Sequence, residues 1–517
     1  MIHGIGNVIA AMTVVASCLG QGAQASTSAS APISPGDPPV IVRLFRGVTS
    51  VSVESADELE IGSAGSSAPL APGEWQFVRV KAAPPKQRYH VFSKTFRPGE
   101  EPAMQEYLAD WRAKGFHAEP VLRGDRYETT DGAILDGRQY WMSLARAATE
   151  AEAQRIVKRL EAQQTYAWVR VETTQPGSGT VSVRSGGRQV ASLGLPLAIR
   201  CAGPVSIKAG KGAGQYAGAI RLWVEPDSTL GVYETLPVED YLAGVLPAEM
   251  PSTWPKEALE AQAITARSDV LEHLGFKHVL EGFHFTNSQG DRVYAGLGGR
   301  LPSTDAAVAA TRGQVLVSGG RIVPAVFSSN CGGWTEDNEA VWSSPPNAAL
   351  RGVSDLFDKS DKSNPDKDIS AWLGARPAAY CAADSQGFRW TRRFTGKQLD
   401  GIVSQRYRVG HVTAIQPGER GASGRLKSVT IKGTKGSAVV RKELPIRQAF
   451  GDLPSAVLII KEERGPSGPA AWTFAGGGRG HGVGLCQHGA RGMALEGFDH
   501  AAIVTHYFSG SALATVR

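Results

Sequence analysis

The amino-acid sequence predicts a multidomain α+β protein that is rich in short strands. The chain has 517 residues, which is too long for one compact domain. Its hydrophobic fraction of 42% and charged fraction of 20% are typical of globular proteins, and 61 glycines indicate many turns. Helical patterns are few and lie between runs of strand-like alternation, which favours segregated helices and sheets.

The first 25 residues predict a cleaved signal peptide. Ile5 to Val15 is an apolar run too short for a convincing membrane span, and Ala23-Gln24-Ala25 follows as a small-residue cleavage site. Val15-Ala16-Ser17-Cys18 also resembles a bacterial lipobox, in which Cys18 would be lipidated and retained. Because no Lys or Arg precedes the apolar run, a poorly ordered cytosolic terminus is the alternative. We expect an exported protein of the periplasm or cell envelope, either released or lipid-anchored.

A polar Ser/Ala/Pro linker over residues 26–39 separates this segment from a short β segment, residues 40–85. The formal net charge of the chain is only +6, and it is spread along the sequence. The excess favours an anionic partner such as a cell-wall polymer or a membrane surface. Nucleic acid is not expected as a partner, because no zinc-finger spacing and no aromatic RNA-binding segment is present.

Residues 86–175 are expected to form a small self-contained module. Thr149 and Glu152 make a capping box for a helix that runs to about Gln163, and Gly115 ends an earlier helix. The expected elements in order are a strand at 89–96, a helix at 102–114, strands at 116–122 and 140–145, the capped helix, and a strand at 168–171. This β-α-β-β-α-β order is the split βαβ arrangement.

Short strands return after the module, in residues 176–517. Val181, Val183, Val190 and Leu193 alternate with polar residues, and Ile220–Val224 is expected to pair with Leu230–Tyr233. The same texture occurs in residues 40–61. One β unit is therefore expected to be interrupted by the module, because loop tips tolerate insertions.

The segment from Leu236 to Pro251 precedes an expected helix, with Glu249 at the start of that helix. Thr253 is the expected cap, and Pro255 suits the first turn. Apolar residues then recur at three- and four-residue steps and predict one buried stripe: Leu259, Ala263, Ala266, Val270 and Leu274. Arg267 lies beside that stripe, from where it could reach a carboxylate or a sugar oxygen.

Glu249 lies between two apolar residues and two prolines. This setting could fix its direction and partly desolvate it, which enables a carboxyl group to hold a proton near neutrality. The residues alone favour a simpler interpretation, a carboxylate that the helix dipole stabilises at a helix entry.

Four separated motifs resemble the SpoIID/LytB family, in the family's order. They are Glu239–Leu242 with Glu249–Pro251 and Ala261–Arg267, Gln289–Gly296, Ala325–Trp342, and Gly480–Ala490. The resemblance spans most of 177–517, and 40–61 are expected to be the family's first strands. The module at 86–175 resembles a SPOR domain, which binds peptidoglycan glycan strands that lack stem peptides; an unrelated small α+β domain is the alternative.

The resemblance implies a peptidoglycan lytic transglycosylase that cleaves between MurNAc and GlcNAc, with Glu249 as the acid/base. A single carboxylate suffices, because the C6 hydroxyl of the sugar attacks within the same molecule and no cofactor is required. LytB-type relatives imply a second possibility, a binding protein that stimulates a cell-wall amidase. A third is a metal-dependent amidase built on His481, His488 and the cysteines.

Further residues are candidates for binding the sugar. Glycines allow the backbone to approach a ligand closely, and nearby polar side chains supply donors and acceptors. The candidates are Arg267, Tyr294, Ser329, Gly332, Gly333, Glu336, His481 and Gln487. Taken singly, each is more often structural than functional.

Cys331, Cys381 and Cys486 are expected to lie close together, because two of them occur within the family motifs. Three thiolates with His481 or His488 could bind zinc tetrahedrally. The competing interpretation is a disulfide, either Cys331–Cys381 or Cys331–Cys486, which an oxidising compartment allows. Cys201 is expected in the core.

Overall fold

The computed structural model describes residues 37–517 except 64–65, 289, 359–363 and 466–467. The expected signal peptide, the lipobox at Cys18 and most of the linker lie outside these residues. The chain folds into two compact units. The N-terminal unit contains residues up to 124, 138–245 and 274–300, and the C-terminal unit contains 125–137, 246–273 and 301–517. No helix in the described part of the chain is both long and apolar enough to cross a lipid bilayer.

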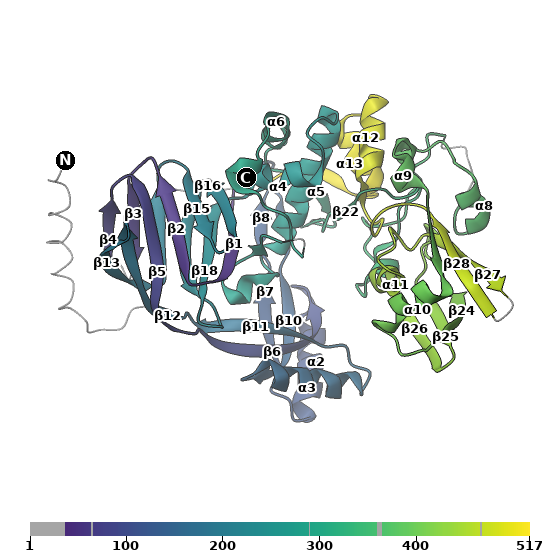
Figure 1. Cartoon of the computed structure of the whole chain (residues 1–517), viewed down its shortest axis with the longest axis horizontal. Helices are drawn as coiled ribbons and strands as arrows, with labels where there is room; N and C mark the ends of the chain where they lie inside the picture. Colours follow the sequence, from purple (N-terminus) through teal and green to yellow (C-terminus); the bar gives the residue numbers. More distant parts are fainter. Residues whose placement is uncertain (1–36, 64–65, 289, 359–363, 466–467) are drawn as a thin grey trace. The chain divides into compact units, whose positions relative to one another are not determined.

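Two large sheets form most of the N-terminal unit (Figure 1). One has the order β19-β1-β18-β17-β14-β3-β4 and the other β13-β12-β5-β2-β15-β16. Their strands are β1 (Pro39–Val48), β2 (Ser50–Ser55), β3 (Leu59–Ser63), β4 (Ser66–Leu70), β5 (Gly73–Ala83), β12 (Ser178–Ser185), β13 (Arg188–Leu195), β14 (Leu197–Cys201), β15 (Val205–Ala209), β16 (Gly212–Tyr216), β17 (Ala219–Val224), β18 (Leu230–Pro237) and β19 (Phe285–Thr286).

Strands from before and after the module pair with one another in both sheets. Antiparallel β1 and β18 place Val40 opposite Leu236, and β5 pairs with β12, where Phe77 lies opposite Val183. Alternate side chains of β1 and β2 are buried, as expected for strands with one face on a core. Strand pairing therefore makes residues 40–83 and 178–237 one β structure, into which residues 86–175 are inserted.

The inserted segment contains the expected strands and helices in order, with an additional hairpin, β8–β9, between β7 and β10. Its sheet order is β11-β6-β10-β7, and neighbouring strands are antiparallel. The elements are β6 (Lys86–Phe96), α2 (Glu101–Ala113), β7 (Glu119–Arg123), β10 (Gln139–Ala147), α3 (Glu150–Glu161) and β11 (Trp168–Gln175). Thr149 caps α3 as predicted, by accepting the Glu152 N–H. Helices α2 and α3 lie along one face of this sheet (Figure 1) and pack on a core that includes Met142 and Leu144.

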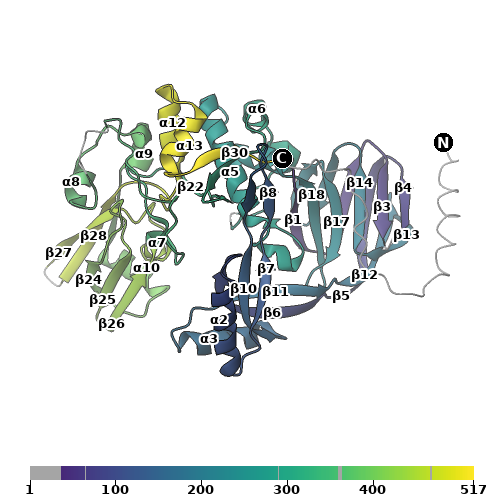
Figure 2. The ribbon, with the colours of Figure 1, turned by 180° about the vertical axis from the view of Figure 1, so that it is seen from behind.

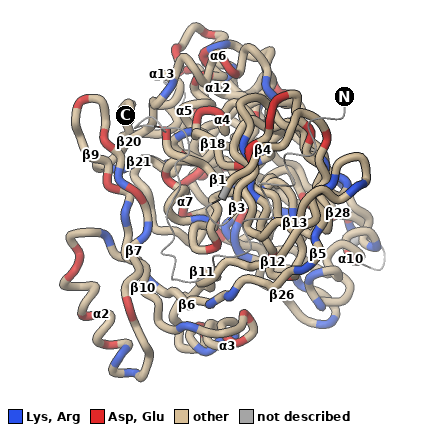
Figure 3. The backbone as a smooth tube through the Cα atoms, turned by 90° about the vertical axis from the view of Figure 1, so that its left-hand side faces the viewer, with Lys and Arg blue, Asp and Glu red and all other residues tan. Residues whose placement is uncertain are grey.

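The opposite face of the same sheet is also covered. His90, Phe92 and Ser143 are buried on that face. Trp141 stacks on Phe276, with ring centroids 5.8 Å apart, and the 3-10 helix η2 (His278–Glu281) contacts β11. Both broad faces of the module are therefore occupied by the chain's own residues. Helices α2 and α3 each carry charges of both signs (Figure 3), in keeping with the diffuse charge of the sequence.

The C-terminal unit is built on helix α5, which is buried on all sides. Every residue from Ala258 to Leu271 is buried, because α6, α12, α13 and β20 pack against the helix. Figure 2 shows α12 and α13 beside α5. The prediction of a single buried stripe was therefore wrong. Hydrophobic periodicity could not reveal this, because the polar residues of α5 are buried too, among them Glu260, Gln262 and Arg267.

Two hydrophobic cores lie within this unit, one around α5, α12 and α13 and one within residues 390–474. The helices are α5 (Lys256–His273), α6 (Pro302–Ala310), α7 (Asn338–Val341), α8 (Ile369–Gly374), η4 (Tyr380–Ala383), α9 (Ser385–Phe388), α10 (Gly396–Ser404), α11 (Glu443–Ala449), α12 (Gln487–Leu495) and α13 (His500–Tyr507). The strands are β8 (Arg126–Glu128), β9 (Ile134–Asp136), β20 (Gln314–Ser318), β21 (Arg321–Ile322), β22 (Phe327–Ser328), β23 (Trp390–Thr395), β24 (Val412–Pro417), β25 (Ser428–Gly433), β26 (Gly436–Arg441), β27 (Leu458–Gly465), β28 (Gly468–Gly476), β29 (Leu485–Cys486) and β30 (Ala512–Thr515).

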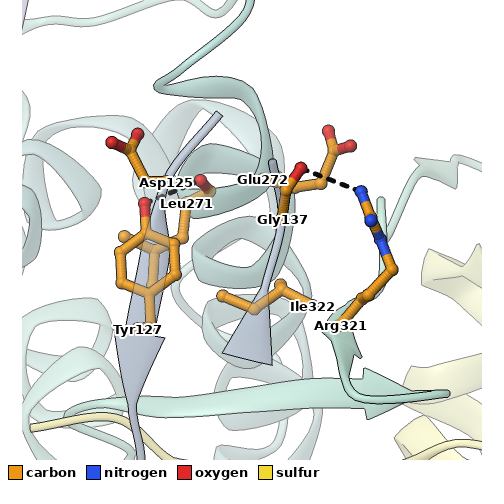
Figure 4. Close-up of a pocket in the computed structure, with 7 residues that line it drawn as sticks. All are labelled: Asp125, Tyr127, Gly137, Leu271, Glu272, Arg321 and Ile322. Carbon is orange, nitrogen blue, oxygen red and sulfur yellow. Dashed lines mark hydrogen bonds between the residues drawn. The ribbon is translucent and has the colours of Figure 1, made fainter. Parts of the chain in front are cut away.

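The hairpin β8–β9 comes from the inserted segment but belongs to the C-terminal unit. The Tyr127 hydroxyl donates to the main-chain oxygen of Leu271 at 2.9 Å, and the Arg321 guanidinium donates to that of Gly137 at 2.8 Å (Figure 4). These residues line a small cavity at the end of α5. Burial raises the pKa of the Tyr127 hydroxyl far above its ordinary value, so this contact keeps its proton.

Candidate active site

Glu249 is the last residue of helix α4 (Val238–Glu249). The expectation that it stands at the start of a helix was wrong, because α5 begins only at Lys256. The C-terminal end of a helix carries the negative end of its dipole, which gives no stabilisation to a carboxylate. Stabilisation at a helix entry therefore does not explain why a glutamate occurs here. Its side chain is partly exposed.

The C-terminal Gly-rich motif reaches the Glu249 segment through Gln487. The Gln487 side-chain amide donates to the main-chain oxygen of Glu249 at 2.9 Å and to Gln262 Oε1 at 3.3 Å. Gln487 is the first residue of α12 and is almost fully buried. Its expected role as a direct sugar ligand is therefore replaced by a positioning role, in which it holds the end of α4 against α5.

A partly exposed group of side chains lies beside Gln487. The rings of Trp254 and His488 meet edge to face with centroids 4.9 Å apart, and the Arg491 guanidinium lies 5.6 Å from the Trp254 ring centroid. His488 Nε2 is 3.4 Å from Asp384 Oδ2. Burial lowers the pKa of His488, although the Asp384 carboxylate opposes this shift. Aromatic faces with a few directed polar groups are typical of ligand sites.

Ser329 is the predicted site residue that joins this group. Its main-chain oxygen accepts the main-chain N–H of His488 at 3.0 Å, and its side chain is partly exposed. Trp254, Asp384 and Arg491 were not predicted from the sequence as site residues. Trp254 follows Glu249 between Pro251 and Pro255, and this aromatic residue next to the candidate acid was a usable signal. Asp384 lies outside every motif and gave none.

Arg267 was expected near the substrate, but it is fully buried. Its guanidinium donates to the main-chain oxygens of Val308 and Gln314, both at 3.2 Å, and to Thr311 Oγ1 at 3.4 Å. These bonds tie α5 to the end of α6 and the start of β20. Arg267 is therefore a structural residue.

Glu336 and Tyr294 are also buried. The Glu336 carboxylate accepts the Ser423 hydroxyl at 2.6 Å, and burial raises the pKa of this carboxyl group. Tyr294 belongs to the N-terminal unit, where its ring lies 5.3 Å from that of Tyr241. Burial, followed by the charge of Glu234, raises the pKa of Tyr294 far above its ordinary value.

Gly332 and Gly333 pack against the chain itself. Both have positive φ angles, 81° and 100°. A Cβ atom would lie 2.9 Å from the Gly478 nitrogen at the first position and 2.7 Å from the Trp372 ring at the second. Packing therefore requires glycine at both positions, and a close approach of this backbone to a ligand stays a prediction.

His481 lies in a separate environment. Its ring contacts Trp342 with centroids 5.0 Å apart, and its Nδ1 accepts the Val483 N–H at 3.1 Å. Burial, followed by the charge of Arg425, lowers the pKa of His481 to about 4, so the ring is neutral at pH 7. Neither His481 nor His488 belongs to a cluster of potential metal ligands among the described residues. The prediction that one of them completes a zinc site was therefore wrong.

These observations define a class of protein: a strand-rich, multi-sheet chain in which Gln487, at the start of α12, binds the main chain of a partly exposed glutamate. A family model described as Stage II sporulation protein (SpoIID) matches residues 226–317, and one described as a domain of unknown function (DUF8618) matches 336–484. Stage II sporulation protein D of Bacillus subtilis is 30% identical over 292 residues, which cover 54% of this chain and 74% of that protein. The chain therefore belongs to the SpoIID/LytB family, as the motifs predicted.

Two other relatives extend the comparison. An uncharacterized protein of Brachyspira hyodysenteriae is 28% identical over 299 residues, or 57% of this chain and 71% of that protein. The amidase enhancer of Bacillus subtilis is 26% identical over 294 residues, or 53% of this chain and only 40% of that protein. In each comparison the matched region covers only part of this chain and part of the relative.

Proposed function

We propose that this protein is a peptidoglycan lytic transglycosylase and that Glu249 is its acid/base. The observation that carries the proposal is the position of Glu249. Glu249 is partly exposed at the end of α4, and the Gln487 side-chain amide donates to its main-chain oxygen. It also lies within the motif that resembles the family's catalytic segment.

A lone carboxylate is sufficient for this reaction. Glu249 would protonate the glycosidic oxygen that leaves MurNAc, and the resulting carboxylate would take the proton from the C6 hydroxyl as that oxygen bonds to C1. The nucleophile belongs to the substrate, so its effective concentration is high and no second enzyme carboxylate is required. Trp254 offers an aromatic face for a sugar ring, and Arg491 and His488 offer donors for its hydroxyl groups.

The test is the mass of the products from purified peptidoglycan. Wild-type protein should release muropeptides lighter by one water than those of a hydrolysing muramidase, because the 1,6-anhydro ring retains no added water. Glu249→Gln should reduce the release by about 10²–10⁴-fold. Glu257→Gln is a matched control, because Glu257 is a partly exposed carboxylate on α5 that binds His500. Equal activity of wild type and Glu249→Gln would refute the assignment.

A second function is favoured by the relative named amidase enhancer. In this alternative the protein binds cell wall and stimulates an N-acetylmuramoyl-L-alanine amidase without cutting glycan. The discriminating measurement is the rate of stem-peptide release by a purified amidase, with wild-type protein or Glu249→Gln added. Equal stimulation by both, together with no anhydro product from either, would establish the binding function.

We further propose that the protein acts in the cell envelope on peptidoglycan glycan strands, with denuded strands as ligands of the SPOR-like module. Neither broad face of the module's sheet is open, so glycan would have to bind at its edges or loops. Retention of the chain by wall from which an amidase has removed the stem peptides, compared with untreated wall, tests the preference. Equal retention would contradict it.

A further inference from the structure

We propose that Cys331, Cys381, Cys486 and Asp355 form a structural zinc site in the C-terminal unit. The three sulfur atoms and a carboxylate oxygen of Asp355 all lie within 4.8 Å of one another. All four residues are buried, with at most 1% of their surface exposed. Three thiolates and one carboxylate are ligands that zinc accepts, and four protein ligands are typical of a structural site.

The spacing of the sulfur atoms fits a shared metal ion. Cys331 Sγ and Cys381 Sγ are 3.6 Å apart. Two sulfur atoms bound tetrahedrally to zinc at about 2.3 Å lie about 3.8 Å from each other. A disulfide bond requires about 2.05 Å, and the cysteines in the described chain are free thiols. A disulfide between any two of the three would also leave the third thiol buried beside Asp355, whereas a metal ion uses all three.

Main-chain donors already hold the ligands as a metal site requires. Cys486 Sγ accepts the Cys331 N–H at 3.1 Å and the Gly489 N–H at 3.4 Å. N–H groups that point at sulfur stabilise a thiolate, and Cys486 caps the N-terminus of α12, where the helix dipole favours negative charge. These two N–H groups orient the Cys486 sulfur, as hydrogen bonds to metal ligands commonly do.

Asp355 supplies the clearest argument for a cation. Its Oδ1 accepts the Tyr507 hydroxyl at 2.6 Å and its Oδ2 accepts the Cys381 N–H at 2.9 Å. Within the described residues, no Lys, Arg or His side chain forms an ion pair with Asp355. A buried carboxylate without a compensating charge is strongly unfavourable. A divalent cation between Asp355 and the three sulfur atoms supplies that charge.

The position of the site gives it a structural consequence. Its ligands come from four separate segments: the loop after β22, the loop that contains Asp355, η4, and the end of β29. Cys486 directly precedes Gln487, whose amide holds the Glu249 main chain. The ion would therefore fix the segment that supports the candidate active site. The zinc proposal itself does not depend on the proposed glycan cleavage.

Metal analysis of the purified full-length protein tests the site. We expect one zinc per chain after gel filtration, and an intense thiolate-to-metal absorption with tetrahedral d–d bands when cobalt replaces zinc. Cys381→Ser should reduce the bound zinc at least tenfold. Cys201→Ser should retain it, because Cys201 lies in the N-terminal unit beside Ser55.

The wild-type cobalt spectrum decides the question even if Cys381→Ser fails to fold. Alkylation of the protein unfolded in chelator should then label Cys331, Cys381 and Cys486 in every chain. A disulfide between any two of them in peptide maps would overturn the proposal. So would metal-free protein, with no cobalt spectrum, after expression in zinc-supplemented medium.

Discussion

Replacement of Arg267 separates a structural role from a role in substrate binding. Arg267→Met keeps a long unbranched side chain but removes the donors to the Val308 and Gln314 main-chain oxygens. Each buried polar group left without its partner costs about 1–3 kcal/mol. Two such groups would cost about 2–6 kcal/mol. The Val308 oxygen keeps a weak bond from the Thr311 hydroxyl at 3.4 Å, so we expect a total loss in the lower half of that range, about 2–4 kcal/mol.

The assay is thermal unfolding of the full-length chain, followed by calorimetry. A loss of this size should lower the melting temperature of the transition that contains α5 by roughly 10 °C, since each kcal/mol shifts a domain of this size by about 2–4 °C. Hydrogen exchange of the α5 amides identifies that transition. Arg267→Lys keeps the charge but not the planar fork, and it should be intermediate.

Arg491→Met is the matched control. Arg491 lies over Trp254 at the candidate site, so its loss should weaken glycan binding and leave the melting temperature within about 2 °C, the usual limit for a surface substitution. A purely structural role for Arg267 would be refuted if Arg267→Met had the melting temperature of the wild type while its affinity for glycan fell. That result would show that Arg267 reaches the substrate.

Three further predictions follow from other contacts. Gln487→Leu should reduce anhydro-product release by folded protein about tenfold or more, and it should also cost about 1–3 kcal/mol of stability because the buried Gln262 Oε1 loses its donor; unchanged release would remove the positioning role of its bond to the Glu249 main chain. Gly332→Ala should destabilise the protein by about 2–4 kcal/mol. Gly319→Ala is the control and should cost about 1 kcal/mol, because Gly319 also has a positive φ but has open space around it. Equal losses of the two variants in urea unfolding would contradict the packing argument. Burial lowers the pKa of His284 to about 4, and its Nδ1 accepts the Ile41 N–H at 3.0 Å. The folded state therefore holds the neutral ring. The resulting contribution to the free energy of unfolding, at most about 3 kcal/mol, is complete above pH 6.5 and is lost as the pH falls towards 4. His284→Asn should flatten that slope, and an unchanged slope would exclude His284 as its source.

Local signals in the sequence predicted most helices and strands of residues 86–175, but not the β8–β9 hairpin. Its helices begin and end at residues with specific roles, such as the Thr149 cap, and its strands alternate clearly. Helix α4 was missed because Gly244 and Pro247 both disfavour a helix interior. Glycine is required at position 244 because a Cβ atom there would lie 2.4 Å from the Tyr294 ring. That requirement is a long-range contact, which no local pattern contains.

Some residues of the candidate site could likewise be predicted from the sequence, and others could not. Motifs located Glu249, Gln487 and the neighbouring cysteines, because these residues lie in ordered, recognisable runs. Arg267 and Glu336 are buried by segments that are distant in sequence. The sequence alone therefore could not decide whether a polar residue in a motif binds a ligand or lies in the core. Asp355 lies outside all four motifs, and only folding places it beside the three thiols.

The division of the chain between its two units limits how this protein can be taken apart. The backbone passes from one unit to the other at residues 124–125, 137–138, 245–246, 273–274 and 300–301. Deleting residues 86–175 as a block would also remove the β8–β9 hairpin, with its bonds from Tyr127 to Leu271 and from Arg517 to Glu128. The inserted segment is therefore not an exchangeable cassette. A shuffled or truncated gene would have to carry the hairpin and its partner surface on α5 together.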